Sequence, residues 1–214
     1  MADLLSNGPD DAAWTIALAH GAGQGMDSAF MNAFAEGLVN RGEPPGGLRV
    51  VRFEFPYMAA RRHTGKQRPP DREPVLLTSW REVIVGLAQT GCSRERLLIG
   101  GKSLGGRMAS LIANEQGVAG LVCLGYPFHP PGKPEKLRTD HLIGLQTPTL
   151  ICQGERDPFG ARKEVQGYKL SAVIQLHWLT DGDHGFKPRK ASGYSEADNW
   201  ESAMTAIIRF VGSL

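Results

Sequence analysis

Near its middle the sequence reads Leu97-Leu98-Ile99-Gly100-Gly101-Lys102-Ser103-Leu104-Gly105-Gly106. A short apolar run ends in a glycine turn, and a stretch with helical periodicity follows from Leu104. A G-x-S-x-G pattern between a strand and a helix is typical of a nucleophile elbow, a turn so tight that glycines must flank the serine. We therefore expect the Ser103 hydroxyl above the sheet at a helix N-terminus, where the Leu104 amide favours a developing oxyanion.

Two other motifs share part of this stretch. A phosphate-binding P-loop needs glycine five residues before Gly101, where the sequence has Arg96. Ser103 acting only as the N-cap of a helix is the simpler structural alternative, because serine is favoured at that position in any helix.

Apolar runs alternate along the chain with stretches of helical spacing. Strands are predicted at residues 14–19, 48–55, 96–100, 120–124, 148–152 and 173–179; helices are predicted at 26–40, 76–89, 104–115 and 197–211, and partly over 157–169. Because the strands are almost continuously apolar, both faces of their sheet should be covered. The pattern predicts an α/β fold, a mostly parallel, doubly wound sheet with helices on both faces, in a single domain over residues 1–214.

Composition excludes several classes of protein. The 24 Lys and Arg residues nearly balance the 22 Asp and Glu residues, giving a net charge of +2, so no nucleic-acid partner is predicted. No apolar run approaches the ~20 residues of a membrane helix, and residues 1–7 lack the pattern of a signal peptide. Three cysteines (Cys92, Cys123 and Cys152) cannot all pair within one chain and match no metal motif, which favours reduced thiols in a cytoplasmic protein.

Two candidate partners of Ser103 follow later strands. Asp157 lies in the turn after 148–152, and His184 lies in a glycine-bracketed loop after 173–179. The order Ser, Asp, His agrees with the chain order of a nucleophile, an orienting acid and a base in α/β folds. Each residue also has a plainer interpretation: Asp157 before Pro158 suits a helix N-cap, and His184 suits a surface loop. The rival acids are Glu155, Asp181 and Asp183.

The first predicted strand ends in the glycine-rich turn His20-Gly21-Ala22-Gly23-Gln24-Gly25. A dinucleotide fingerprint would need glycine where Met26 stands. An H-G-x-G turn better suits a second oxyanion donor, either the backbone amide of Ala22 or that of Gly23. His20 is interpreted as a structural support for this loop. The simpler alternative, an ordinary turn between a strand and a helix, does not exclude a role as oxyanion donor.

Together these motifs resemble the α/β-hydrolase superfamily across nearly the whole chain. Residues 101–110, 20–23 and 55–58 are similar to those of small hydrolases that are distantly similar to dienelactone hydrolases. The resemblance implies that Ser103 is a nucleophile, His184 a base and Asp157 its orienting acid. It also implies an enzyme without cofactor or metal that acts on carboxylic esters or related acyl compounds.

Two features depart from that family pattern. The first predicted strand corresponds to the superfamily's third, so the usual N-terminal antiparallel strands are expected to be missing. Dienelactone hydrolases carry cysteine where this chain has Ser103, so lactone hydrolysis is not carried over. Some members of this group of small hydrolases look like scaffolding proteins, so a non-catalytic role is the alternative.

The sequence offers few clues to the substrate. Residues 125–146 are too few and too proline-rich for a multi-helix lid, so we expect no cap domain and an open, shallow site. Gly21, Gly23, Tyr57 and Phe128 are predicted to contact the substrate. Residues 57–74 are predicted to be a loop of charge +3, from five Lys and Arg against two Asp and Glu; it either attracts an anionic substrate or is simply solvated.

The sequence-based hypothesis is a serine hydrolase that cleaves small-molecule carboxylic esters through Ser103, His184 and Asp157, with the amides of Ala22 and Leu104 as oxyanion hole. The main alternative is a binding or scaffold protein that keeps the fold without the chemistry. A third is acyl transfer or peptide cleavage by the same residues. The pattern carries no information on oligomeric state.

Overall fold

A computed structural model describes residues 3–42 and 44–214; Met1 and Ala2, at the start of the segment predicted to lack a signal peptide, lie outside the described residues. One sheet contains the strands β1 (Leu4–Asn7), β2 (Trp14–Ala19), β3 (Leu48–Phe53), β4 (Leu97–Lys102), β5 (Gly120–Leu124), β6 (Thr149–Gly154) and β7 (Ile174–Leu179). Their order across the sheet is β1-β3-β2-β4-β5-β6-β7, and every neighbouring pair except β1 with β3 is parallel.

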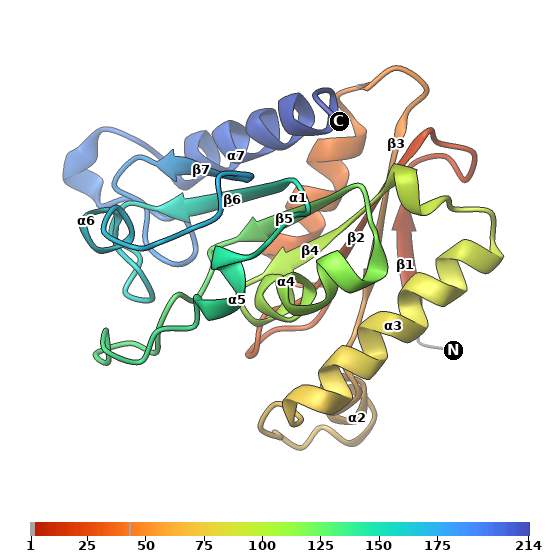
Figure 1. The fold of residues 1–214 in the computed structure, drawn as a ribbon, viewed down its shortest axis with the longest axis horizontal. Helices are drawn as coiled ribbons and strands as arrows, with labels where there is room; N and C mark the ends of the chain where they lie inside the picture. The colour runs from red at the N-terminus through yellow and green to blue at the C-terminus, as the bar shows by residue number, and fades with distance from the viewer. Residues whose placement is uncertain (1–2, 43) are drawn as a thin grey trace.

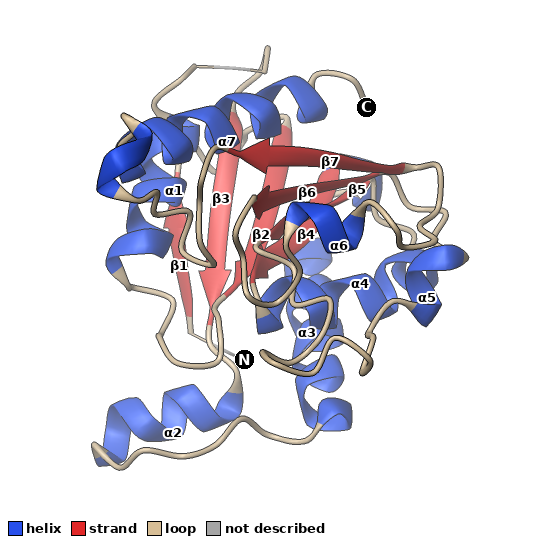
Figure 2. Ribbon diagram, turned by 90° about the vertical axis from the view of Figure 1, so that its left-hand side faces the viewer, coloured by secondary structure: helices blue, strands red, loops and turns tan. Residues whose placement is uncertain are grey.

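Helices cover both faces of this sheet (Figures 1 and 2). Helices α1 (Ala29–Val39) and α7 (Glu196–Val211) pack on one face, and α3 (Glu73–Gln89) and α4 (Leu104–Gln116) pack on the other. The shorter elements are α2 (Pro56–Thr64), α5 (Asp140–Ile143), α6 (Arg162–Val165) and the 3-10 turns η1 (Arg94–Arg96) and η2 (Lys190–Ser192). The predicted fold class is confirmed, and residues 125–146 hold only the four-residue helix α5 instead of a lid.

The strands form where the sequence is apolar on both sides of the chain. All residues of β2, β3, β5 and β6 are buried, as expected for strands sandwiched between two layers of helices. Because β4, β5, β6 and β7 are parallel neighbours, their carboxyl ends meet at one edge of the sheet. The turns predicted to carry the chemistry therefore lie together at that edge.

The expectation that no antiparallel strand precedes β2 is wrong. Strand β1 pairs antiparallel with β3, with Leu4 opposite Phe53 and Asn7 opposite Val50. It has only four residues, and Leu4 and Leu5 are 45% and 36% exposed. A strand this short and exposed leaves no long apolar run in the sequence. Its pairing with β3 depends on contacts between segments that are far apart in the chain.

The predicted loop over residues 57–74 is also partly wrong, because it begins with the nine-residue helix α2. Pro56 stands at its first position, and Gly65 ends it in the left-handed conformation (φ 67°). Only Tyr57 and Met58 of this helix are buried, and basic residues fill its last turn. The sequence therefore shows no apolar repeat of helical spacing here. The helix is tied to the sheet by Arg62, whose guanidinium lies 2.6 Å from Glu54.

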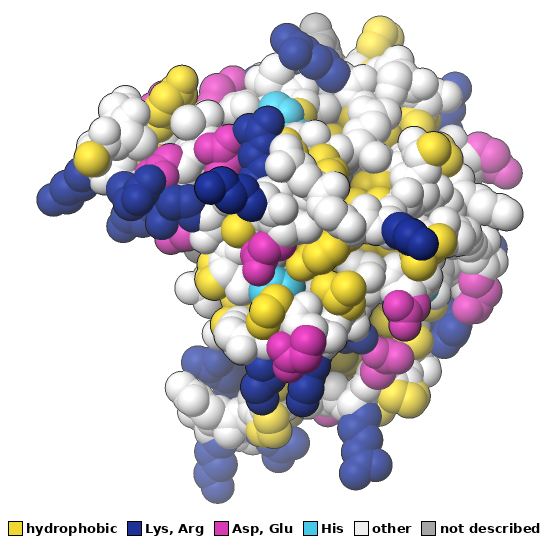
Figure 3. All heavy atoms as spheres, turned by 60° about the vertical axis from the view of Figure 1, so that its left-hand side comes forward, with side chains coloured by type: hydrophobic (Ala, Val, Ile, Leu, Met, Phe, Trp, Pro, Cys, Tyr) yellow, Lys and Arg dark blue, Asp and Glu magenta, His cyan; other side chains and the backbone are white. Residues whose placement is uncertain are grey.

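The surface agrees with the balanced composition. In the space-filling view, positive and negative side chains are interspersed with hydrophobic ones over the face shown (Figure 3). Within the described residues, none of the helices has the length and apolar character needed to cross a bilayer.

The core on the α3–α4 face generates a stability prediction. Trp80 of α3 is fully buried, and its ring packs edge-on against Phe53 at 4.7 Å between centroids. Trp80→Ala should lower the free energy of unfolding by about 3–5 kcal/mol, because a large cavity replaces the ring. Val85→Ala on the same helix, where Val85 is 46% exposed, should change it by less than about 0.5 kcal/mol. Urea denaturation of both variants measures the difference, and equal stabilities would contradict this account of the core.

Candidate active site

Ser103 stands on a strained turn between β4 and α4. Its backbone angles are φ 50° and ψ −109°, a combination that residues with a side chain rarely adopt. The turn also crowds the neighbouring strand: a side-chain carbon on Gly101 would lie 2.0 Å from the carbonyl oxygen of Ala19, and one on Gly105 would lie 2.3 Å from the same atom. Only glycine fits at either position, and the sharp turn leaves Ser103 projecting from the carboxyl edge of the sheet.

The structure brings Ser103, His184 and Asp157 together. His184 Nε2 lies 2.9 Å from Ser103 Oγ, and His184 Nδ1 lies 2.7 Å from Asp157 Oδ2. Since a carboxylate only accepts hydrogen bonds, Nδ1 must carry the ring proton in this contact. In a neutral imidazole, Nε2 is then an acceptor aimed at the Ser103 hydroxyl. Hydrogen bonds connected in this way allow the imidazole to take a proton from the hydroxyl during nucleophilic attack.

Asp157 is fully buried, and its carboxylate is held by more than the imidazole. The backbone amide of Phe159 donates to Oδ1 at 2.8 Å, and the side-chain amide of Gln153 donates to Oδ2 at 3.0 Å. The Phe159 ring lies beside the imidazole, with 4.2 Å between ring centroids. These contacts limit the orientations available to both Asp157 and His184.

Gln153, near the end of β6, is a supporting residue that the sequence reasoning missed. It is fully buried; its Oε1 accepts from the amide of Tyr126 at 2.7 Å, and its Nε2 also lies near the carbonyl oxygens of Tyr126 and Gly160. The side chain thus joins the turn after β5 to the carboxylate of Asp157. A polar residue directly after the apolar run of β6 was the signal that could have indicated it.

The three rival acids are bound elsewhere. Glu155 pairs with Arg162 at 2.6 Å. Asp181 pairs with Arg189 and Arg156, and these pairs hold its pKa down at about 2, with the hydrogen bond from Arg189 as the largest cause. Asp183 accepts from the backbone of its own loop, and within residues 3–42 and 44–214 Asp157 is the acid hydrogen-bonded to His184. The described residues contain no cluster of three or more His, Cys, Asp or Glu that could hold a metal ion.

The glycine loop after β2 lies directly against the elbow, since a side-chain carbon on Gly21 would be 3.9 Å from Ser103 Cβ. His20 braces this loop: its Nε2 accepts from the amide of Phe55 at 3.1 Å, and its Nδ1 lies 2.6 Å from the carbonyl oxygen of Gly21. Burial lowers the pKa of His20, which agrees with a neutral ring that donates at Nδ1 and accepts at Nε2. In the described chain, the backbone amides of Ala22 and Leu104 have no protein acceptor.

A cavity of about 580 Å³ opens beside Ser103 and His184. Gly21, Ala22 and Gly23 line it on the side of the glycine loop. Its apolar wall is formed by Phe30, Met31, Phe159 and Trp200. A volume of this order suits a small organic ligand.

Tyr57 and Phe128, which were predicted to contact the substrate, are not among the residues that line this cavity. Tyr57 is 2% exposed, and its hydroxyl donates to the carbonyl oxygen of Ala22 at 3.1 Å, which makes it a brace of the glycine loop. Phe128 is fully buried, with its ring 4.8 Å from that of Tyr126. Both aromatic rings follow strands of the sheet but turn back into the core, where their apolar area is removed from water.

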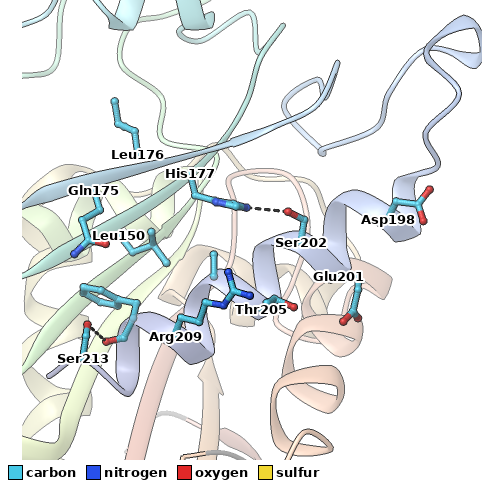
Figure 4. A pocket seen from close by; sticks show the side chains of 12 residues that line it. Leu150, Gln175, Leu176, His177, Asp198, Glu201, Ser202, Thr205, Arg209 and Ser213 are labelled. Atoms are coloured by element: carbon cyan, nitrogen blue, oxygen red, sulfur yellow. Dashed lines mark hydrogen bonds between the residues drawn. The ribbon is translucent and has the colours of Figure 1, made fainter.

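A second cavity of about 630 Å³ lies between β7 and α7 and contains another histidine–serine pair (Figure 4). His177 Nε2 lies 2.9 Å from Ser202 Oγ. In the described chain no carboxylate bonds to the other ring nitrogen of His177, and Ser202 lies inside a regular helix instead of on a strained turn. The pair thus lacks both the orienting acid and the exposed elbow that distinguish Ser103.

Comparisons with known proteins agree with the fold. Residues 12–212 match the family model described as "Alpha/beta hydrolase domain". Among solved structures, the chain is similar to an alpha-beta serine hydrolase homologue from Coxiella burnetii (TM-score 0.70, 17% identity, 96% of this chain and 89% of that chain). It is also similar to a serine hydrolase without a lid from Xanthomonas campestris (TM-score 0.67, 20% identity, 97% of this chain and 88% of that chain). A third similar structure is Est1E from Butyrivibrio proteoclasticus (TM-score 0.67, 14% identity, 98% of this chain and 94% of that chain). At these identities the likeness shows the fold.

The crowding at the elbow predicts that Gly105 cannot be replaced. Gly105→Ala should lower the free energy of unfolding by at least about 2 kcal/mol, because the added carbon would overlap the backbone of Ala19. Gly86→Ala in α3 is the matched control: nothing lies within 4 Å of its added carbon, so stability should stay equal or rise by up to about 1 kcal/mol. Chemical denaturation compares them. A Gly105→Ala protein as stable as the unchanged chain would show that the turn is not packed as described.

Proposed function

The chain belongs to the alpha/beta hydrolase domain family, and on that premise we propose that it is a serine hydrolase that cleaves small carboxylic esters. The observation that carries the proposal is the connected series of hydrogen bonds from buried Asp157 through His184 to Ser103 on its strained turn. Esters and related acyl compounds are the substrates whose cleavage such a series serves.

The first half of the proposed reaction forms an acyl-enzyme. Ser103 Oγ attacks the ester carbonyl carbon while His184 Nε2 takes its proton. The negative oxygen of the tetrahedral intermediate is stabilised by the backbone amides of Ala22 and Leu104 and by the N-terminus of α4. His184 then gives the proton to the alcohol oxygen, the carbon–oxygen bond breaks and the alcohol leaves.

The second half releases the acid. Water enters beside His184, gives its proton to Nε2 and attacks the acyl carbon of the Ser103 ester. The second tetrahedral intermediate collapses, the proton returns to Ser103 Oγ and the carboxylic acid leaves. Throughout, Asp157 holds the imidazole in one tautomer and stabilises its charged form without taking the proton itself.

The shape of the cavity supports a small substrate with an apolar part. Phe30, Met31 and Trp200 offer an apolar wall on one side of Ser103. A short or medium acyl chain, or an aromatic group of similar size, would lose contact with water against these side chains. The basic residues that follow α2 are not among those that line the cavity. The proposed reaction does not depend on them.

Replacing the nucleophile tests the proposal. Ser103→Ala should lower kcat/KM for chromogenic esters of acetate, butyrate and octanoate by roughly 10³-fold or more, because the acyl-enzyme cannot form. The matched control is Ser202→Ala, since Ser202 also pairs with a histidine but lies outside the candidate site. This control should hydrolyse the esters at an unchanged rate.

Labelling with a fluorophosphonate, followed by peptide mass spectrometry, identifies the reactive residue independently of substrate choice. The expected result is one adduct, on Ser103. Equal ester hydrolysis by the Ser103→Ala protein, or no adduct on Ser103 in the folded chain, would contradict the proposal and favour a binding protein with this fold. Adding alcohols to the assay separates hydrolysis from acyl transfer, because a transferase would release mainly the ester of the added alcohol, whereas a hydrolase would release mainly the free acid.

A further inference from the structure

Lys102, the residue before Ser103, has a role that the proposed reaction leaves unassigned. It is the last residue of β4, and its side chain lines the same cavity as Ser103 and His184. The ammonium donates to the backbone carbonyl oxygen of His184 at 2.6 Å. It also lies 5.5 Å and 5.6 Å from the ring centres of Phe30 and Phe186. Lys102 is therefore held by its charged end at the base of the loop that follows β7 and carries His184, called here the histidine loop.

The turn after β5 leaves space for this contact. Gly125 has φ 70°, and a side-chain carbon there would lie 2.8 Å from Lys102 Nζ, 3.1 Å from the carbonyl oxygen of His184 and 3.3 Å from His184 Nδ1. Any larger residue would push the ammonium and the histidine apart. Because both nitrogens approach one point so closely, Lys102 Nζ and the imidazole lie within about 6 Å of each other.

Burial makes this ammonium unfavourable by itself. Removal from water lowers the pKa of Lys102 to about 8, while the nearby carboxylates of Asp157 and Asp183 act in the opposite direction. A buried charge is retained where a charge of opposite sign offsets its loss of hydration. Here the fully buried carboxylate of Asp157 carries a negative charge that a neutral imidazole does not balance, and Lys102 supplies the positive one.

We propose that Lys102 is a positioning residue for His184. Its ammonium ties the main chain of the histidine loop to the strand that carries Ser103, and its positive charge keeps the imidazole neutral and able to accept a proton. This inference rests on the proposed function of His184 as the base. Lys102 does not itself touch the reacting atoms, since its hydrogen bond goes to the carbonyl oxygen of His184.

The charge of Lys102 has a definite effect on pH dependence. A positive charge on the imidazole is disfavoured beside the ammonium of Lys102. Three carboxylates lie near this site: Asp157 from the β6 turn is bonded to the ring, Asp183 from the histidine loop acts on Lys102, and Glu196 at the start of α7 lines the cavity. These carboxylates favour the imidazolium. Removing the ammonium leaves them unopposed, and His184 should then become charged at a higher pH.

The experiment compares three substitutions in the full chain. Lys102→Met keeps the length and removes the charge, Lys102→Gln removes the charge but keeps an N–H donor, and Lys102→Arg keeps the charge. Lys169→Met, at an exposed lysine outside the cavity lining, is the control. Two quantities are measured against pH: kcat/KM for a short-chain ester, from the acid produced, and the imidazole signals of His184 by NMR spectroscopy.

The expected result for Lys102→Met and Lys102→Gln is that the acid limb of kcat/KM and the NMR titration of His184 both move up by about one pH unit. Lys102→Met should also lose about tenfold in kcat at the plateau, because the loop has lost its anchor. Lys102→Arg should restore the wild-type pH profile, and Lys169→Met should not differ from it. If either neutral variant fails to fold, the other carries the comparison.

The outcomes separate this inference from the proposed function. Ester hydrolysis by the unchanged chain, with neutral variants whose pH profile and NMR titration superimpose on it, would overturn the role of Lys102 and leave the hydrolase intact. No hydrolysis and no labelling of Ser103, together with the expected NMR shift, would instead contradict the hydrolase and retain Lys102 as the residue that keeps His184 neutral.

Discussion

The 2.7 Å hydrogen bond between the buried Asp157 carboxylate and the His184 ring is the contact on which the candidate site depends. It determines which ring nitrogen carries the proton, and therefore that the other faces Ser103 as an acceptor. A carboxylate without access to water is stable only when its oxygens are bonded. The amide of Phe159 and the side chain of Gln153 supply those bonds, and the ammonium of Lys102 balances the charge. Asp157 and His184 are thus held in one arrangement.

The parallel sheet brings these groups together from distant parts of the sequence. Ser103 follows β4, Asp157 follows β6 and His184 follows β7, and these strands end at the same edge. The elbow adds a local constraint, because the end of β4 and the start of α4 both pack so closely against Ala19 of β2 that Gly101 and Gly105 cannot carry a side chain. The strain at Ser103 persists because buried strands on both sides hold the turn. The second pair, His177 and Ser202, has the distance of a catalytic contact but none of these supports.

The parts of the fold that the sequence predicted well are those with a local physical signal. The predicted strands at residues 14–19 and 120–124 have the observed bounds, since each is an apolar run next to a glycine or polar turn. Strand β1 and helix α2 were missed because the first has four residues, none of them buried, and the second buries only two. Gln153, Tyr57 and Phe128 show the limit at the site: whether a side chain near a strand end faces the cavity or the core is decided by packing against elements far away in the sequence. The order of Ser103, Asp157 and His184 was readable because parallel strands place all their carboxyl ends at one edge, and the catalytic roles of these residues stay proposals.

Substitution of the orienting acid tests the central claim most directly. Asp157→Asn keeps the shape of the side chain but removes the charge that holds the ring tautomer, whereas Asp183→Asn changes the rival acid beside His184 and keeps its loop contacts. The account predicts that kcat for ester hydrolysis falls about 10⁴-fold in Asp157→Asn and stays close to the wild-type value in Asp183→Asn. A wild-type kcat in Asp157→Asn, or the large loss in Asp183→Asn instead, would contradict it.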